Sequence, residues 1–241
     1  MIPQVDLPLA ILLAANLVMF IASAVQASVG VGIALVSVPL LALLHPQLVP
    51  GPMLLSGSLV ALVTAYRERQ AINYRGFGLS LAGLALGTVI GALALNALHG
   101  PNVERVFAVL ILIAVGLSVA GLRVRPTPVS LGVGGTAAGI MGTMVGIHGP
   151  PISIVFQDAQ PDYARAMLGA FFFIAYLASC VALALFGLFG VLELKRAAAL
   201  LPGVCAGLLV APLVAGRVSQ AQLRAAILLI SAGSAVLLLL R

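Results

Sequence analysis

Long apolar runs without a single charge constrain what this chain can fold into. Residues 7–25 contain no charged side chain, and neither do residues 77–98. A helix needs about 20 apolar residues to cross the roughly 30 Å hydrocarbon layer of a bilayer. Of the 241 residues, 62% are hydrophobic and 7% are charged, whereas soluble domains carry roughly 25% charged residues. Only lipid solvates so apolar a surface, so we predict a polytopic membrane protein.

The apolar runs divide the chain into about ten segments, and we predict an all-α fold of about 8–10 helical segments. Strands are not expected, because the runs lack an alternation of period two and are longer than barrel strands. No cation precedes the first run, so we expect a retained membrane segment and not a cleaved signal peptide. The predicted segments are 7–25, 33–44, 50–66, 74–98, 103–122, 129–145, 150–157, 163–189, 194–215 and 221–240.

The second five segments resemble the first five. The Val-Gly-Val sequence at 29–31 precedes the Val-Gly-Ile sequence at 145–147 by 116 positions, and Gly83 precedes Gly203 by 120. Features in one order at a nearly constant offset indicate an internal duplication. The basic, proline-containing loop between the sets marks the boundary. The predicted units are a first membrane repeat, 1–122, and a second membrane repeat, 123–241.

Each predicted repeat contains an interrupted pair of short apolar pieces. Two crossings need about 40 residues, but 129–157 holds only 29, so one piece must end within the membrane. The first repeat has a similar glycine-containing interruption at 26–32, followed by the 12-residue piece 33–44. Matching interruptions in two repeats are the best sequence indication of a transporter's binding site.

The orientation of the two repeats is open from the sequence. Parallel and inverted arrangements both place eight cations on the cytoplasmic side and four outside, so the positive-inside rule does not choose between them. The shortness of 150–157 favours inverted repeats, each with a re-entrant segment.

The interruptions predict an anion site. A helix that begins inside the membrane leaves its first N–H groups without intrahelical partners and directs its positive dipole end at them, which suits a desolvated anion. The alternatives are that the glycines only allow close helix packing and that the hydroxyls bond to their own helices. The candidate substrate-binding residues are Gln26, Ser28, Gly30, Gly32, Ser58, Thr143, Gly146, His148, Gly149 and Pro150.

His148 is the most informative of these candidates. It lies between two glycines in a turn predicted to be at membrane depth, where ionisable groups are usually functional. It could donate a hydrogen bond to an anion or take part in proton coupling. The alternative is a neutral histidine bonded to a backbone carbonyl.

Short motifs recur in an order and spacing typical of one transporter family. They are Gly30-Val31-Gly32, Val38-Pro39, Pro46, Ser58-Leu59, Tyr66-Arg67 and Asn73-Tyr74-Arg75 in the first half, and the run from Gly146 to Pro151, Arg165-Ala166 and Phe172-Phe173 in the second. Over residues 20–215 the chain thereby resembles the TauE/SafE sulfite exporter family. The resemblance implies a multi-pass carrier of the bacterial inner (plasma) membrane that exports sulfite or moves organosulfur anions such as sulfoacetate.

The chain departs from the family pattern at three places. Ile33 and Ala34 follow Gly32 where further glycines are usual, His148 stands where glycine is common, and Gly57 precedes Ser58 where threonine is common. The first two departures bear on the shape of an anion pocket and hence on the substrate.

Other function classes fit less well, and we predict no enzyme activity, catalytic residue, metal or cofactor. No His-Glu-x-x-His motif and no phosphate-binding loop occurs, and all six acidic residues fall near segment ends. The net charge of +6 lies in short loops, where membrane topology explains it better than nucleic acid does.

We therefore predict a secondary transporter of a small anion that works by alternating access in the lipid bilayer. Sulfite or an organosulfur anion such as sulfoacetate is the expected substrate, and proton coupling is an option. A passive ion channel or another small-solute permease remains the alternative. The direction of transport and the oligomeric state are open.

Overall fold

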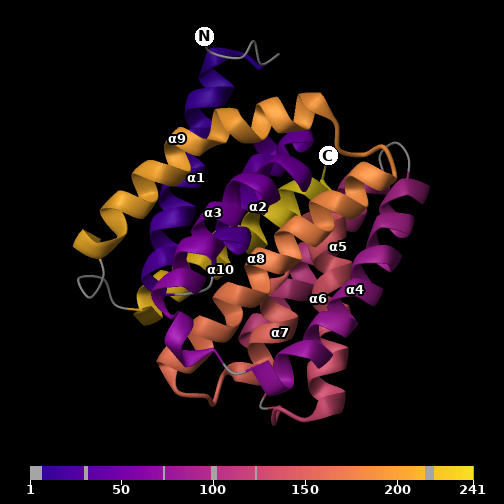
Figure 1. Cartoon of the computed structure of the whole chain (residues 1–241). Helices are drawn as coiled ribbons and strands as arrows, with labels where there is room; N and C mark the ends of the chain where they lie inside the picture. Colours follow the sequence, from indigo (N-terminus) through magenta and orange to yellow (C-terminus); the bar gives the residue numbers. More distant parts are fainter. Residues whose placement is uncertain are drawn as a thin grey trace.

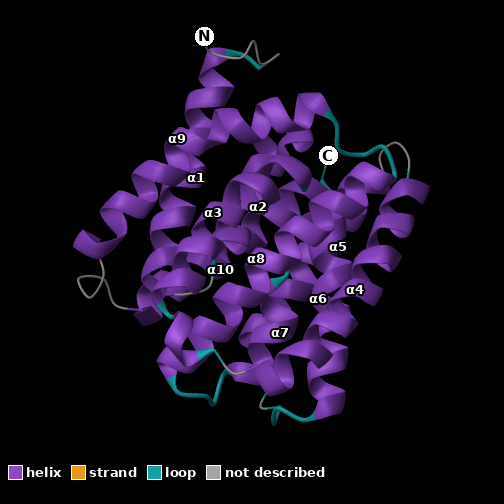
Figure 2. Ribbon diagram, in the orientation of Figure 1, coloured by secondary structure: helices purple, strands orange, loops and turns teal. Residues whose placement is uncertain are grey.

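A computed structural model describes residues 7–29, 32–72, 74–98, 102–122, 124–214 and 220–240. Within these ranges the chain is helical and contains no strand (Figures 1 and 2). The elements are α1 (Leu9–Val29), α2 (Ile33–Leu44), η1 (Pro46–Leu48), α3 (Gly51–Arg67), η2 (Arg69–Ala71), α4 (Tyr74–Ala97), α5 (Asn102–Val119), α6 (Pro128–Val145), α7 (Gly149–Phe156), α8 (Pro161–Leu185), α9 (Val191–Val214) and α10 (Gln220–Leu239).

The all-α prediction is confirmed, and each predicted apolar segment corresponds to one helix. Seven segments of the described chain are long and apolar enough to cross a membrane. Helix α1 shows what faces the lipid, because Leu9, Leu13 and Leu17 follow one another at helical spacing and are 69%, 62% and 58% exposed. The protein is a multi-pass membrane protein.

Two helix pairs pack with their backbones in contact, and each joins the first half of the chain to the second. Helix α4 packs along α6, where a Cβ atom on Gly87 would lie 2.0 Å from the Thr136 carbonyl oxygen. Helix α9 crosses α1 (Figure 1), where a Cβ atom on Gly203 would lie 2.2 Å from the Asn16 carbonyl oxygen. The glycines spaced four residues apart on α4 (Gly83, Gly87 and Gly91) and on α9 (Gly203 and Gly207), here called the glycine stripes, therefore allow close helix packing.

Helices α2 and α7 are the short pieces predicted at the interruptions. Helix α7 has 8 residues, so at 1.5 Å per residue it is about 12 Å long, less than half the hydrocarbon layer. Gly146 ends α6 in the left-handed conformation, with φ of 88°. The loop between α6 and α7 lies inside the bundle (Figure 2), and residues 146–149 are buried.

Candidate functional site

A cavity of about 630 Å³ reaches the starts of both short helices. Gly32, which precedes α2, and Pro150, in the first turn of α7, line it together. The two interruptions are far apart in the sequence and meet at one cavity. Its wall also includes the C-terminal end of α5 and the N-terminal parts of α8 and α10.

A buried polar cluster lies beside these helix starts. The Gln26 side chain accepts a hydrogen bond from the Ile33 N–H, with Oε1 3.2 Å from the nitrogen. Gln26 also lies within hydrogen-bonding reach of the Tyr176 hydroxyl. The Tyr176 ring in turn packs against His148, with the ring centroids 5.2 Å apart. One chain of side chains therefore connects the start of α2 to the turn before α7.

His148 lies at the inner end of this cluster and is fully buried. Its Nε2 is 3.1 Å from the Ser179 hydroxyl, which is 2.8 Å from the Thr143 hydroxyl. The Gly146 carbonyl lies close to the ring, but Nδ1 has no hydrogen bond of acceptable geometry among the described residues. The ring occupies the space beside Gly142, where a Cβ atom would lie 2.1 Å from Nε2.

The serine hydroxyls in and near the cavity donate to their own helices. Ser28 donates to the Ala24 carbonyl at 2.7 Å, and Ser153 donates to the Gly149 carbonyl at 2.7 Å. Bonding of a hydroxyl to its own helix was the alternative to substrate binding in the sequence analysis. The hydroxyl hydrogens are therefore engaged, and the anion-facing donors of the cavity have to come from other groups.

The first turns of α2 and α7 supply fewer free backbone N–H donors than two helix starts normally would. Pro150 and Pro151 have no N–H, so the first turn of α7 keeps only two of its four potential free donors. In α2, the Ile33 N–H is already bonded to Gln26. The dipole ends remain, and an anion in the cavity could take further hydrogen bonds from charged side chains.

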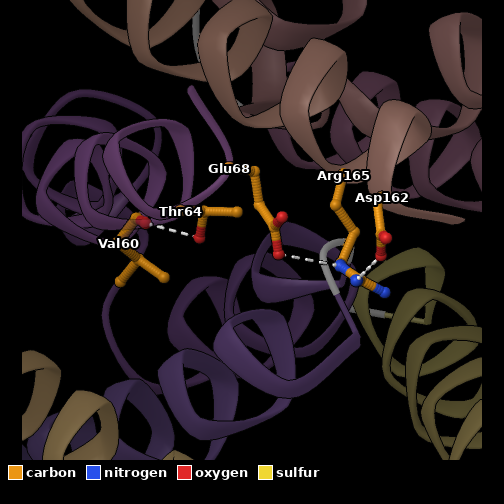
Figure 3. Close-up of polar contacts among 5 residues, drawn as sticks. All are labelled: Val60, Thr64, Glu68, Asp162 and Arg165. Atoms are coloured by element: carbon orange, nitrogen blue, oxygen red, sulfur yellow. Dashed lines mark hydrogen bonds and ion pairs between the residues drawn. The ribbon is translucent and has the colours of Figure 1, made fainter. Parts of the chain in front are cut away.

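Among the described residues, two arginines line the cavity and no Asp or Glu does. Arg165, on α8, is held by two carboxylates (Figure 3). Its Nε is 3.3 Å from Glu68 Oε1 at the end of α3, and its Nη2 also pairs with Asp162. Arg224, on α10, donates to the Ser118 carbonyl and has no carboxylate partner within the described parts of the chain. Arg224 is therefore the uncompensated cation of the cavity.

The ten candidate residues fall into distinct groups. Ser28, Gly32 and Pro150 line the cavity, while Gln26, Thr143 and His148 belong to the buried cluster. Gly146 and Gly149 form the turn between α6 and α7. Ser58 lies in neither group, because its hydroxyl donates to the Leu55 carbonyl on α3. Gly30 lies outside the described residues.

Sequence reasoning did not single out Arg224, Tyr176 or Ser179. Arg224, in the predicted segment 221–240, was counted only among the cytoplasmic cations of the inverted arrangement. Tyr176 and Ser179 stand in a long apolar run, where a polar residue gives no indication of its partner. Four-residue spacing from the family motif at Phe172 places Tyr176 on the same helix face, and the two rings stack with centroids 6.0 Å apart.

Gly32→Ala is expected to reduce transport at least tenfold. Gly32 has φ of 129° and ψ of −11°, a region that costs an L-residue about 1–3 kcal/mol and would distort the start of α2. The measurement is initial flux per folded protein in proteoliposomes. Gly187→Ala is the matched control, because Gly187 has φ of 73° but is exposed and away from the cavity. An equal loss in both variants would contradict a local effect.

Comparison with known proteins identifies the family. A model of the Sulfite exporter TauE/SafE family matches residues 15–238, nearly the whole chain. No curated protein and no solved structure matches the chain. The family's description agrees with a multi-pass membrane protein that transports sulfite or a similar anion. The chain belongs to the TauE/SafE sulfite exporter family.

Proposed function

We propose that this protein is a secondary transporter that moves sulfite or an organosulfur anion, such as sulfoacetate, by alternating access. The observation that carries the proposal is the cavity at the starts of α2 and α7, which, within the described part of the chain, two arginines line and no carboxylate does. Guanidinium groups and helix N-termini both favour anions over cations. The anion binds at the inner end of this cavity, between Gly32 and Pro150.

Inverted repeats, 1–122 and 123–241, are part of the proposal. The first cavity touches the C-terminal end of α5 but the N-terminal end of α10. These helices hold the fifth position in the two halves and run in opposite directions. The pairing of α1 with α9 and of α4 with α6 supports a twofold relation between the halves, because each pairs the first helix of one half with the fourth of the other.

The face onto which the cavity opens is the cytoplasmic one in this proposal. Arg165 and Arg224 line the cavity, and Arg165 pairs with Glu68, which lies between Arg67 and Arg69 in the sequence. Cations gather in the cytoplasmic loops of multi-pass proteins. An inner (plasma) membrane location then gives a carrier whose central site is reached from the cytoplasm in this conformation.

Alternating access requires that parts of the bundle move as rigid bodies around the site. The backbone contacts of α4 with α6 and of α1 with α9 hold each pair together. Only the Glu68–Arg165 and Asp162–Arg165 contacts hold the cavity mouth at Arg165, and these are partly exposed ion pairs of low strength. The mouth is therefore the easier place to rearrange.

Flux measurements on purified protein test the proposed function. We expect labelled sulfite or sulfoacetate to cross the membrane of proteoliposomes that contain the protein, and the rate to saturate with concentration. A pH gradient imposed in either direction then tests proton coupling separately. Flux of cations without flux of any anion would reject the proposal. Anion flux that does not saturate and shows no exchange between labelled and unlabelled substrate would indicate a passive channel.

A further inference from the structure

A second, smaller cavity of about 300 Å³ lies at the other end of the same helices. It touches Glu104 and Phe107 near the start of α5, whereas the first cavity touches Leu117 and Ser118 near its end. From Glu104 to Ser118 the helix rises about 21 Å at 1.5 Å per residue. The two cavities therefore face opposite sides of the bundle.

Helix α2 connects the two cavities. Gly32 and Leu35, at its start, line the first cavity, while Ala42, near its end, lines the second. The α2 residues between them, from Val36 to Pro39, are buried. The central segment of α2 is thus part of the barrier that separates the two cavities.

The cavities occupy corresponding places in the two proposed repeats. The second is lined by Val103, Glu104 and Phe107 on α5. The first is lined by Leu223, Arg224 and Ile227 on α10, which are 120 positions later. An offset of 120 also relates the glycine stripes of α4 and α9. Corresponding turns of α5 and α10 thus line the two cavities, but the first repeat has the acidic Glu104 where the second has the basic Arg224.

Neither charge is neutralised by a nearby partner. Glu104 has no ion pair within the described residues, and the neighbouring Arg105 is exposed and does not line the cavity. A further arginine, Arg196, donates to Gln47, which lines the second cavity, and it pairs with Glu193 at 3.4 Å. In the same way, Arg165 at the first cavity is neutralised by its carboxylates.

We propose that the second cavity is the opposite entrance to the same anion site, and that Arg224 and Glu104 make the two entrances bind anions unequally. The inference rests on the proposed transport function. An anion that approaches from the first cavity meets an uncompensated guanidinium, and one that approaches from the second meets an uncompensated carboxylate. Glu104 is half-buried and Arg224 is exposed, so each charge acts on an ion in its cavity through a field that solvent partly screens.

The two faces differ in their affinity for the anion, whereas the concentration and voltage gradients set the direction of net transport. Net flux must be zero when the anion concentrations are equal and the membrane potential is zero. A carrier therefore has the same Vmax/KM for transport in the two directions. The face with Arg224 therefore has the lower KM and also the lower Vmax. We expect the two charges, one at each entrance, to make the KM values of the two faces differ by about tenfold.

Sulfite uptake into right-side-out and inside-out vesicles, with the potential clamped at zero, measures the two KM values. Arg224→Gln is expected to raise KM about threefold from its own face, and Glu104→Gln to lower KM about threefold from the other, so that the two effects together account for the roughly tenfold ratio. The double variant R224E/E104R should invert the KM ratio. Arg105→Gln is the matched control, because it removes a charge next to Glu104 that does not line the cavity, and it should leave the ratio unchanged.

The outcomes separate this inference from the proposed function. A wild-type protein that moves no anion in these vesicles rejects the transport function itself. If wild-type flux is clear but the KM values are equal, or if Arg105→Gln changes the ratio as much as Glu104→Gln, the two-entrance proposal is wrong. Normal elution and an unchanged unfolding temperature of each variant exclude misfolding as the cause of a changed KM.

Discussion

Replacing Gly87 by valine is expected to yield a protein that unfolds at a much lower temperature. A Cβ atom on Gly87 would lie 2.0 Å from the Thr136 carbonyl oxygen and 3.0 Å from the Ile140 nitrogen. These are backbone atoms of α6, so no side-chain rotation relieves the clash and the helices must separate. Overpacking costs roughly 1–3 kcal/mol or more, which corresponds to a fall of about 3–12 °C in Tm.

Thermal unfolding in detergent, followed by circular dichroism, measures this effect. Gly78→Val is the matched control, because Gly78 lies on the same helix and a Cβ atom there would meet nothing within 4 Å. Both variants place the same side chain in α4, so their difference isolates the contact with α6. Equal melting temperatures for the two variants would show that the close approach of α4 and α6 does not stabilise the fold.

The helices were predictable because lipid imposes a simple rule on sequence. Every membrane-crossing segment must be apolar for about 20 residues, and a segment too short to cross is recognisable by its length. The eight-residue α7 and the 12-residue α2 were expected on this ground, and the structure has them at those places. Gly32 and Pro150 were likewise predictable, because they flank the interruptions that define these helices.

The partners across the bundle were not predictable from the sequence. Gln26 was expected to donate to a substrate, and in the structure its Oε1 accepts from the Ile33 N–H. Nothing in the sequence indicates that the start of α2 is the partner of this oxygen, because the contact depends on the position of α2. In the same way, one arginine of the cavity is neutralised by Glu68 and Asp162 and the other is not. That difference arises from contacts between helices that are distant in the sequence.

Topology explains why Arg224 was overlooked. A cation near the end of an apolar segment is expected in any multi-pass protein, so Arg224, in the first turns of α10, gave no separate indication of a binding role. Its position relative to Glu104 could have been noticed, because the two are 120 residues apart at the same point of the proposed repeat. Composition counts the charges of the whole chain, so it does not show that the two repeats carry opposite charges at corresponding positions.

Gly142→Ala is expected to lower transport at least tenfold in a protein that still folds. The added methyl would lie 2.1 Å from Cδ2 and Nε2 of His148, so the ring must leave its place. It would then lose the contact with Tyr176 and the hydrogen bond to Ser179. A buried hydrogen bond left unmade costs about 1–3 kcal/mol, and each 1.4 kcal/mol is about a tenfold change in an equilibrium.

Gly132→Ala is the matched control, because Gly132 lies on α6 and a Cβ atom there would meet nothing within 4 Å. Flux of sulfite per folded protein, with Tm measured alongside, compares the two variants. The double variant G142A/H148G removes the clash, so we expect it to recover Tm while transport stays low. Normal flux in Gly142→Ala would show that the position of the His148 ring does not matter for transport.

The two proposed repeats give a reason to expect that one methyl group disturbs this site. At the offset of 116 that relates the interruptions, Gly142 corresponds to Gln26 and His148 corresponds to Gly32. Each interruption thus has one polar side chain and one glycine, with their positions exchanged between the halves. Gln26, on α1, accepts a hydrogen bond from the Ile33 N–H at the start of α2. His148, in the turn before α7, instead fills the space beside Gly142 with its ring. A side chain at residue 142 as well as at 148 overfills that space, and the G142A variant measures how closely the two interruptions must pack for transport.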